Sequence, residues 1–272
     1  MEFSLKPSLL KKQQRLLFSN ATRSNLNYNS HFGVISLTPE YYPYQSAMRP
    51  YLDFLSALSE NNHKDWMDAN KKWYLDTKAT LVADTEVLLK TMVELEPSLA
   101  SFKAKDCLFR QNRDVRFSAN KNPYKTNFGV YFSPGGKKSP GPGYYLQIQP
   151  GNSFLAGGIW MPEADTLKKI RREIDFSGAD LERIVENPDF KKLFPSLEGE
   201  KLKTCPRDYE ATHPFIEYLK LKSFTVSHPI SDQAVRTGAF IHFGLEGFQQ
   251  MKPLIDFLGQ ALEEVEDGAG LL

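Results

Sequence analysis

The chain has 272 residues, of which 41% are hydrophobic, 25% charged and 12% aromatic, as is usual for a globular protein. Its 34 Lys and Arg residues nearly balance its 33 Asp and Glu residues, so no overall charge excess draws it to nucleic acid or to an anionic membrane. No apolar run reaches the roughly 18 residues of a membrane-spanning helix. The two cysteines, Cys107 and Cys205, do not make a disulfide framework, and they favour a reducing compartment, so we expect a cytoplasmic protein.

The first 48 residues differ from the rest. The stretch 1–37 carries five Lys or Arg residues against the single acid Glu2, is rich in Ser and Asn, and has no sustained periodicity. Such a start is typical of an organelle transit peptide, of a disordered tail, or of translated leader sequence before a genuine start at Met48. We expect residues 1–48 to be a disordered or mis-annotated leader and residues 49–268 to form a single domain.

Two helical patterns open this domain. Leucines recur at helical spacing over 50–60, which predicts a first helix. Apolar residues then recur by threes, fours or heptads over 64–96, which predicts one long amphipathic helix that ends at Pro97. We interpret Trp66 and Trp73 in this helix as core anchors rather than as a platform for a ligand.

The middle of the chain changes to strand-like patterns. Four segments rich in Phe, Tyr, Val and Ile, separated by Gly, Pro, Asn or Ser, cover 106–117, 127–133, 144–149 and 153–161. They follow one another too closely for crossover helices, so they predict an antiparallel meander. A late strand is predicted over 220–228.

Helical patterns return after these strands. A helix is predicted from Pro162, Ser177 can cap a further short helix, and helices follow from about 232 to 266. Helices before and after a contiguous sheet are typical of an α+β fold. The predicted fold is an antiparallel sheet of about five strands in a meander, packed by N-terminal and C-terminal helices.

One stretch, FRQNRDVRFSANKNPYK, concentrates positive charge. Five cations stand against one carboxylate: Arg110, Arg113, Arg116, Lys121 and Lys125 against Asp114. On a strand, Arg110, Asp114 and Arg116 would share one face, and Arg113 would lie among apolar side chains on the other. A buried guanidinium needs a carboxylate or several carbonyl partners, unless a bulge turns it outward. If the Asp114 carboxylate lies between the guanidinium groups of Arg110 and Arg116, one of these two positive charges is not neutralised.

Three interpretations of this cluster stay open. The leading hypothesis is a site for a small phosphate or carboxylate ligand, with or without turnover. In the second, acidic side chains of packed helices, such as Glu163, Asp165 or Asp65, complete a structural network, and the protein is a non-catalytic interaction module. The third, a nucleic-acid surface, is disfavoured because the cluster is compact. The predicted ligand-binding residues are Arg110, Arg113, Asp114, Arg116, Lys121, Tyr124 and Lys125, with Asp114 orienting the arginines and Tyr124 bonding or stacking.

Other chemistry has weak sequence signals. The segment GGKKSPGPG lacks the order of a phosphate loop, and the histidines lack metal-ligand spacing, so we predict neither a cofactor nor a metal. The helix predicted from Pro162 could point its N-terminal N–H groups at an anion if it lies beside Arg116. If it does not, Gly157 and Gly158 before it serve packing. The sequence indicates no oligomeric state.

The segment RDVRFSANKNPYKTN resembles the signature Arg-Asp-x-Arg-Phe-Ser-x-Asp/Asn-Lys-x-Pro-Tyr-Lys of a widespread, mainly microbial family catalogued as domain of unknown function 2461. The segments FLSALSENNHKDWMDANKKWY, AGGIWMPEADTLKKIRREI and HPFIEYLKLKSF match it in order. The resemblance runs from about Tyr51 to Leu262 and implies a natural start near Met48. Asp208 departs from the pattern, where a glycine is expected. The resemblance implies boundaries and a motif, and it implies no activity.

Overall fold

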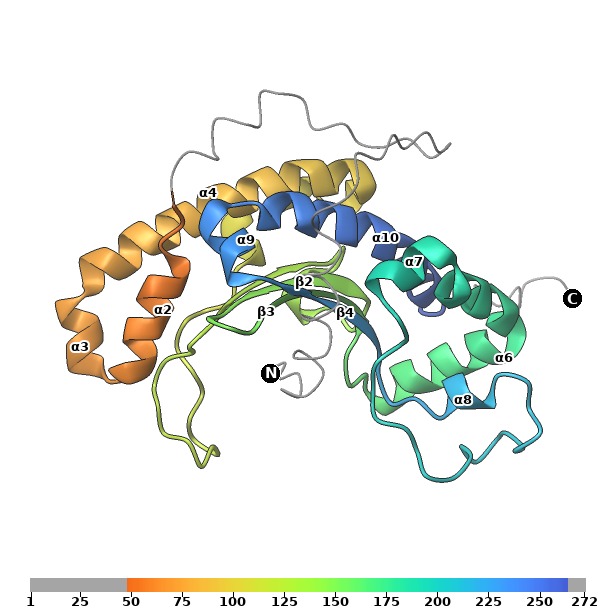
Figure 1. Ribbon diagram of the computed structural model, residues 1–272. Coiled ribbons are helices and arrows are strands. Elements are labelled where there is room, and N and C mark those ends of the chain that lie inside the picture. The colour runs from red at the N-terminus through yellow and green to blue at the C-terminus, as the bar shows by residue number, and fades with distance from the viewer. Residues whose placement is uncertain (1–47, 264–272) are drawn as a thin grey trace, which may run out of the picture. The chain divides into compact units, whose positions relative to one another are not determined.

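A four-stranded antiparallel sheet is the centre of the computed structural model, which describes residues 48–263 (Figure 1). The strands hydrogen-bond in the order in which they occur in the chain, and each neighbouring pair is antiparallel. They are β1 (Phe128–Phe132), β2 (Gly143–Ile148), β3 (Ser153–Ile159) and β4 (Phe224–Ile230). Residues 1–47 lie outside the described residues, so the leader hypothesis stays a prediction.

The helices before the sheet are α2 (Tyr51–Glu60), α3 (Lys64–Ala69) and α4 (Lys71–Leu95), followed by a 3-10 turn at Pro97–Ser101 and the short α5 (Ala104–Cys107). The prediction of one helix over 64–96 is wrong at one point. Asn70 takes φ −105° and ψ 19° and separates α3 from α4. Its side-chain amide donates to the Trp66 carbonyl oxygen at 2.9 Å. An Asn side chain that bonds the nearby backbone in this way competes with the regular helix.

The helices after β3 are α6 (Ala164–Glu186), α7 (Pro188–Leu193) and α8 (Ile216–Leu219), and α9 (Asp232–Thr237) and α10 (Phe240–Gln260) follow β4. The further helix predicted from Ser177 corresponds to the second half of α6. Ser177 takes the non-helical φ −118° and ψ 26°, so a kink separates the two halves of α6 at this residue.

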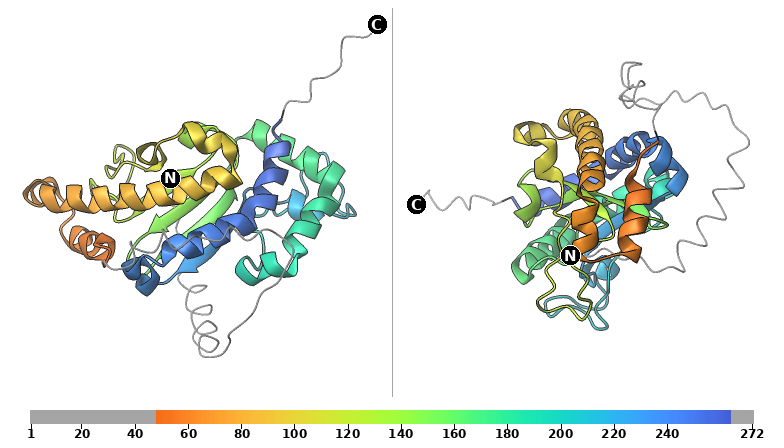
Figure 2. Two further views of the ribbon diagram at one scale, coloured as in Figure 1. Left: turned by 90° about the horizontal axis from the view of Figure 1, so that it is seen from above. Right: turned by 90° about the vertical axis from the view of Figure 1, so that its left-hand side faces the viewer.

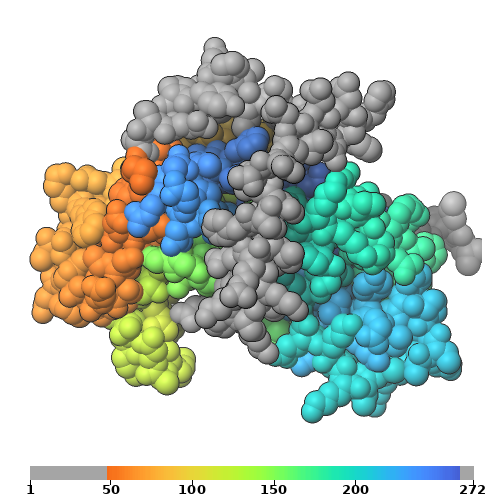
Figure 3. All heavy atoms as spheres, viewed as in Figure 1, coloured from red at the N-terminus to blue at the C-terminus, as the bar shows by residue number. Residues whose placement is uncertain are grey.

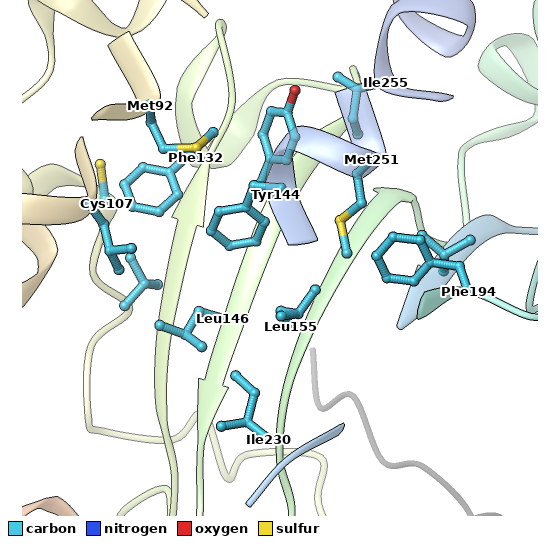
Figure 4. Close-up of a cluster of buried hydrophobic side chains, with 14 of the residues drawn as sticks. Met92, Cys107, Phe132, Tyr144, Leu146, Leu155, Phe194, Ile230, Met251 and Ile255 are labelled. Atoms are coloured by element: carbon cyan, nitrogen blue, oxygen red, sulfur yellow. The ribbon is translucent and has the colours of Figure 1, made fainter. Parts of the chain in front are cut away.

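Helices α4 and α10 lie over the same face of the sheet (Figures 1 and 2). Strand side chains that alternate along β2 and β3, among them Tyr144, Leu146 and Leu155, point into the layer beneath these helices (Figure 4). The ring of Phe248 on α10 packs edge-on to Tyr144 with 5.4 Å between centroids. All four side chains are at most 1% exposed. Because buried apolar area contributes roughly 25 cal/mol per Å², this layer is the main source of stability.

The sequence predicts about five strands, and the strand missing from the sheet is the first one. Over 106–117 the chain finishes α5 and then makes only isolated bridges, from Leu108 to Val130 and from Asn112 to Tyr124. The charge pattern gives the physical reason. A strand with arginines on both faces cannot pack either face on a core without burying a guanidinium.

Gly157 and Gly158 have packing roles on β3. Gly158 has φ 117°, and a β carbon there would lie 1.9 Å from the Phe224 carbonyl oxygen of β4. A β carbon on Gly157 would lie 2.6 Å from the Met251 sulfur of α10. Gly158 therefore requires a residue without a side chain for the approach of β4, whereas a side chain at Gly157 would require the Met251 side chain of α10 to shift.

A buried ion pair fixes the segment just before α2 to α4. Arg49 Nε donates to Asp84 Oδ2 at 2.7 Å, and Arg49 Nη2 donates to Oδ1 at 3.0 Å. The Tyr51 hydroxyl donates to Oδ2 at 2.6 Å. Both charged side chains are at most 3% exposed. Burial, together with the negative charge of Asp84, raises the pKa of Tyr51, so its hydroxyl remains a donor.

Candidate functional site

The positively charged stretch forms a loop between α5 and β1, which we call the basic loop (residues 109–127). It projects beyond the edge of the sheet in Figure 1 and is the yellow-green protrusion in Figure 3. At its base the Lys125 N–H donates to the Gln111 carbonyl at 2.8 Å, and the Arg113 N–H donates to the Pro123 carbonyl at 2.9 Å. The two limbs of the loop thus pair around the Asn112–Tyr124 bridge, and the charged tip lies beyond them.

Two amide side chains that the sequence patterns do not indicate anchor the basic loop. Gln111 is buried, and its Nε2 donates to the carbonyl oxygens of Lys125 and Asn127. Asn62, in the turn between α2 and α3, accepts from the Tyr124 N–H at 3.1 Å and donates to the Tyr124 carbonyl at 2.9 Å. The sequence marks Asn62 only as part of a turn, because its partner is far away along the chain.

At the tip, Asp114 and Arg116 form a two-bond ion pair. Arg116 Nε donates to Oδ1 at 2.9 Å, and Nη2 donates to Oδ2 at 2.6 Å. These bonds lower the pKa of Asp114 to about 2. The prediction that Asp114 lies between two arginine forks is wrong for Arg110. Arg110 acts on Asp114 through its charge alone, with no hydrogen bond between them among the described residues.

Arg113 is half-buried and bonds to its own loop. Its Nη1 donates to the Asn122 carbonyl at 3.2 Å, and its Nη2 lies 3.4 Å from the Ser118 hydroxyl oxygen. Lys121 Nζ donates to the Val115 carbonyl at 3.1 Å, which adds a second bond across the tip. Arg113 was expected to have a carboxylate or several carbonyls as partners; the structure gives it one carbonyl and one hydroxyl, both from the basic loop.

The remaining predicted residues lie near the base of the basic loop. Lys125 Nζ is 5.1 Å from the ring centroid of Phe109, a cation–π contact that holds the amine over the ring. Tyr124 is half-buried against the hydrophobic core, and its backbone is held by Asn62. Arg110 is exposed and makes no ion pair with any residue in 48–263. The structure thus places Arg110, Arg116 and Lys121 outward and Arg113, Tyr124 and Lys125 in supporting positions.

This arrangement leaves N–H donors of charged side chains at an exposed surface. Asp114 is the only acidic residue in the basic loop, and its carboxylate is already bonded to Arg116. Guanidinium groups bind phosphate and carboxylate oxygens through two parallel N–H donors. Because Arg116 uses only Nε and one N–H of Nη2 for Asp114, its other donors can bind a ligand.

The Asp114 pair gives a pH prediction. We expect the Asp114 carboxyl to titrate with a pKa of about 2 in the native protein and to move toward its ordinary value of 3.8 in Arg116→Gln. The donors of Arg116 favour the ionised carboxylate, so the pair is intact above the ordinary pKa and is lost as the pH falls through the lowered one. Carboxyl carbon NMR over a pH titration measures this. Arg110→Gln should change the pKa far less, and an ordinary Asp114 pKa in the native protein would contradict the observed bonding.

The N-terminus of α6 does not reach the basic loop. The two are well separated in Figure 1, so the predicted anion site shared by Arg116 and this helix end is not formed. No three His, Cys, Asp or Glu side chains within 48–263 come together in a group that could hold a metal ion. None of the helices in that range is long and apolar enough to cross a membrane.

The structure defines an α+β protein built on a four-stranded antiparallel sheet. The profile of the family described as conserved hypothetical protein (DUF2461) matches residues 50–257, which is more than half of the chain. The chain therefore belongs to this family, and the resemblance seen in its signature is confirmed. A search of curated proteins and a search of solved structures each gave no match. The description of the family names no activity.

Proposed function

We propose that the protein recognises a small anionic ligand, carrying a phosphate or a carboxylate, at the basic loop. The observation that carries this proposal is the exposed positive charge of the basic loop. The loop contains one carboxylate, and that carboxylate is bonded to Arg116. Arg110 is exposed without an ion-pair partner in the described part of the chain. A bound anion would supply the missing negative charge.

The residues of the basic loop have different roles in this proposal. Arg110, Arg116 and Lys121 contact the ligand, and Asp114 orients Arg116 through its two bonds. Arg113 stiffens the tip and Asn62 fixes the limb that carries Tyr124, so the cations are held before the ligand arrives. Such preorganisation reduces the entropy cost of binding. The proposal is one of recognition, it assigns no reaction, and a cytoplasmic location stays a prediction.

A second candidate, a non-catalytic interaction module, is favoured by Phe117. Its side chain is 97% exposed at the loop tip, and the Arg116 guanidinium lies 5.9 Å from its ring centroid. A phenyl ring in this place gains burial only when another molecule covers it. The Asp114–Arg116 pair joins two residues of the loop itself, so in this case it stiffens the loop instead of fastening helices to the sheet.

Thermal unfolding of the full-length chain tests the leading proposal. We expect the melting temperature to rise with inorganic phosphate, with citrate or with both, compared at equal ionic strength. A ligand at about 100 times its Kd adds roughly 2.7 kcal/mol, or roughly 5 to 10 °C for a chain of this size. The double variant Arg110→Gln/Arg116→Gln should lose most of this shift. Its melting temperature without ligand should stay nearly unchanged, because both side chains are exposed.

Arg183→Gln is the matched control. Arg183 forms a surface ion pair with Asp180 at 2.6 Å and is 77% exposed, close to the 2.6 Å and 76% of Arg116 with Asp114. Arg183 lies on α6, so this variant should keep the full ligand shift. A shift that persists in the double variant, or no shift with any anion, would refute the proposal. A protein partner whose binding is lost in Phe117→Ser would then support the interaction module.

A further inference from the structure

A pocket of about 590 Å³ lies between the first half of α6 and the irregular segment 202–209. Four charged residues of α6 line it: Lys168, Arg171, Arg172 and Asp175. They recur at intervals of three and four, so they form one charged stripe of the helix, while the stripe with Ile170 and Ile174 is buried in the core. In Figure 1 α6 and the basic loop lie apart, so this pocket is a separate place in the molecule.

Positive charge exceeds negative charge in the lining of this pocket. The segment opposite α6 adds Arg207 and Asp208, which makes four cations against two carboxylates. Asp175 Oδ1 lies 2.9 Å from His213 Nε2, so one of these carboxylates already has a partner. Lys168, Arg172 and Arg207 form no ion pair with any residue that the structure describes. The pocket therefore has about two positive charges to offer a ligand.

Arg171 is held in place at the wall of the pocket. Its Nε donates to the Leu219 carbonyl at 2.8 Å, and its Nη2 lies 3.5 Å from the Leu221 carbonyl oxygen. Burial lowers the pKa of Arg171, yet an arginine stays charged at neutral pH. Two of its five N–H donors point to neutral carbonyls, and the others can bind an anion without any rearrangement. The half-buried guanidinium is thus a preorganised cation.

We infer that this pocket binds an organic phosphate monoester of the size of a sugar phosphate or a nucleoside monophosphate. Lys168, Arg171 and Arg172 lie within about one helical turn, which suits one compact dianion better than two separated carboxylates. The volume is larger than an inorganic phosphate needs and lies in the usual range of small-molecule sites.

The other lining residues suit the organic part of such a ligand. Tyr209 offers a ring, and Leu202 offers an apolar side chain. Burial, Asp175 and Asp208 raise the pKa of Tyr209, so its hydroxyl stays protonated and can donate. The exposed carboxylate of Asp208 can accept from a ligand hydroxyl. The site is independent of the ligand proposed for the basic loop.

Alkylation of Cys205 can report whether the pocket is occupied. Cys205 lines the pocket and is half-buried. The other thiol, Cys107, is buried, and burial raises its pKa to about 11, so it reacts slowly. In the native full-length protein, glucose 6-phosphate or adenosine 5′-monophosphate at about ten times its half-protecting concentration should slow the reaction of Cys205 with iodoacetamide about tenfold. Glucose and adenosine should not protect. Peptide mass spectrometry measures both thiols.

The double variant Lys168→Gln/Arg172→Gln tests the phosphate contact. Both side chains are exposed and make no ion pair within the described range, so the melting temperature should stay nearly constant. The half-protecting concentration should rise at least about tenfold, as expected for the loss of two charged contacts. Lys169→Gln, which changes an exposed residue of the same helix outside the pocket lining, is the matched control. Arg110→Gln/Arg116→Gln should also leave protection unchanged, so failure at one site is distinguishable from failure at the other.

Three results would overturn the inference. The first is no protection by either phosphate ester at millimolar concentration. The second is equal protection in Lys168→Gln/Arg172→Gln and in the native protein, or equal protection by glucose or adenosine. The third is protection by succinate at the same concentration as by the phosphate esters, which would assign the pocket to carboxylates.

Discussion

Asp84→Ala should lower the free energy of unfolding by about 3–5 kcal/mol, the usual cost of removing one partner from a buried ion pair. Asp84 accepts from Arg49 at 2.7 and 3.0 Å and from the Tyr51 hydroxyl at 2.6 Å. Without it, a guanidinium that is 3% exposed loses its carboxylate, and a buried phenol loses its acceptor. Desolvated groups left in this state account for most of the expected loss. Urea denaturation followed by circular dichroism measures it.

The loss of unfolding free energy in Asp84→Ala can be compared with the losses in two further variants. Tyr51→Phe removes one hydrogen bond but leaves the ion pair, so it should cost about 1–2 kcal/mol. Asp180→Ala removes the acid of an exposed pair with Arg183 and should cost no more than about 1 kcal/mol. If Asp84→Ala costs as little as Asp180→Ala, the buried pair does not stabilise the attachment of Arg49 to α4.

Gly158→Ala should cost at least about 3 kcal/mol, since it combines backbone strain with a steric clash. Gly158 has φ 117°, which L side chains rarely adopt, and the new β carbon would lie 1.9 Å from the Phe224 carbonyl oxygen. That oxygen belongs to the backbone of the neighbouring strand β4, so β3 and β4 must move apart to relieve the contact.

Gly151→Ala separates the two causes. Gly151 also has a positive φ, of 68°, but a β carbon there meets nothing within 4 Å. This variant should lower the free energy of unfolding by only about 1–2 kcal/mol, the cost of a left-handed backbone conformation for a residue with a side chain. Equal losses in the two variants, measured by the same urea denaturation, would contradict the close approach of β4 to Gly158. A Gly158→Ala chain that does not fold agrees with the expected direction.

The helices and four of the strand positions could be predicted because their apolar residues repeat with regular periods. The break at Asn70 could not, because a single Asn in a long periodic pattern gives only a weak local signal against the helix. The strand predicted over 106–117 was wrong for a physical reason. Phe109, Val115 and Phe117 alternate as in a strand, but the arginines between them cannot be buried, and Phe117 is instead 97% exposed.

The residues of the candidate site could be predicted from the sequence, but their arrangement in space could not. The signature around Arg113 and Arg116 indicates where the cations gather, and the structure places them on one loop. Because this stretch is a loop and not a strand, Arg110 and Arg116 do not lie on one face beside Asp114. Only Arg116 hydrogen-bonds to the Asp114 carboxylate. Asn62 and Arg171 could not be assigned roles, because their partners lie far along the chain. Such long-range hydrogen bonds carry no local sequence period.

NMR of the arginine side chains tests recognition by the basic loop most directly. The Nε–Hε signals of the full-length protein are followed as inorganic phosphate, citrate and the phosphate esters are added at constant ionic strength. We predict that the signals of Arg110 and Arg116 shift with at least one anion and saturate, while that of Arg183, in its equivalent surface pair, stays in place. If Arg110 and Arg116 do not respond to any of these anions, or respond no more than Arg183, the basic loop is not a small-anion site.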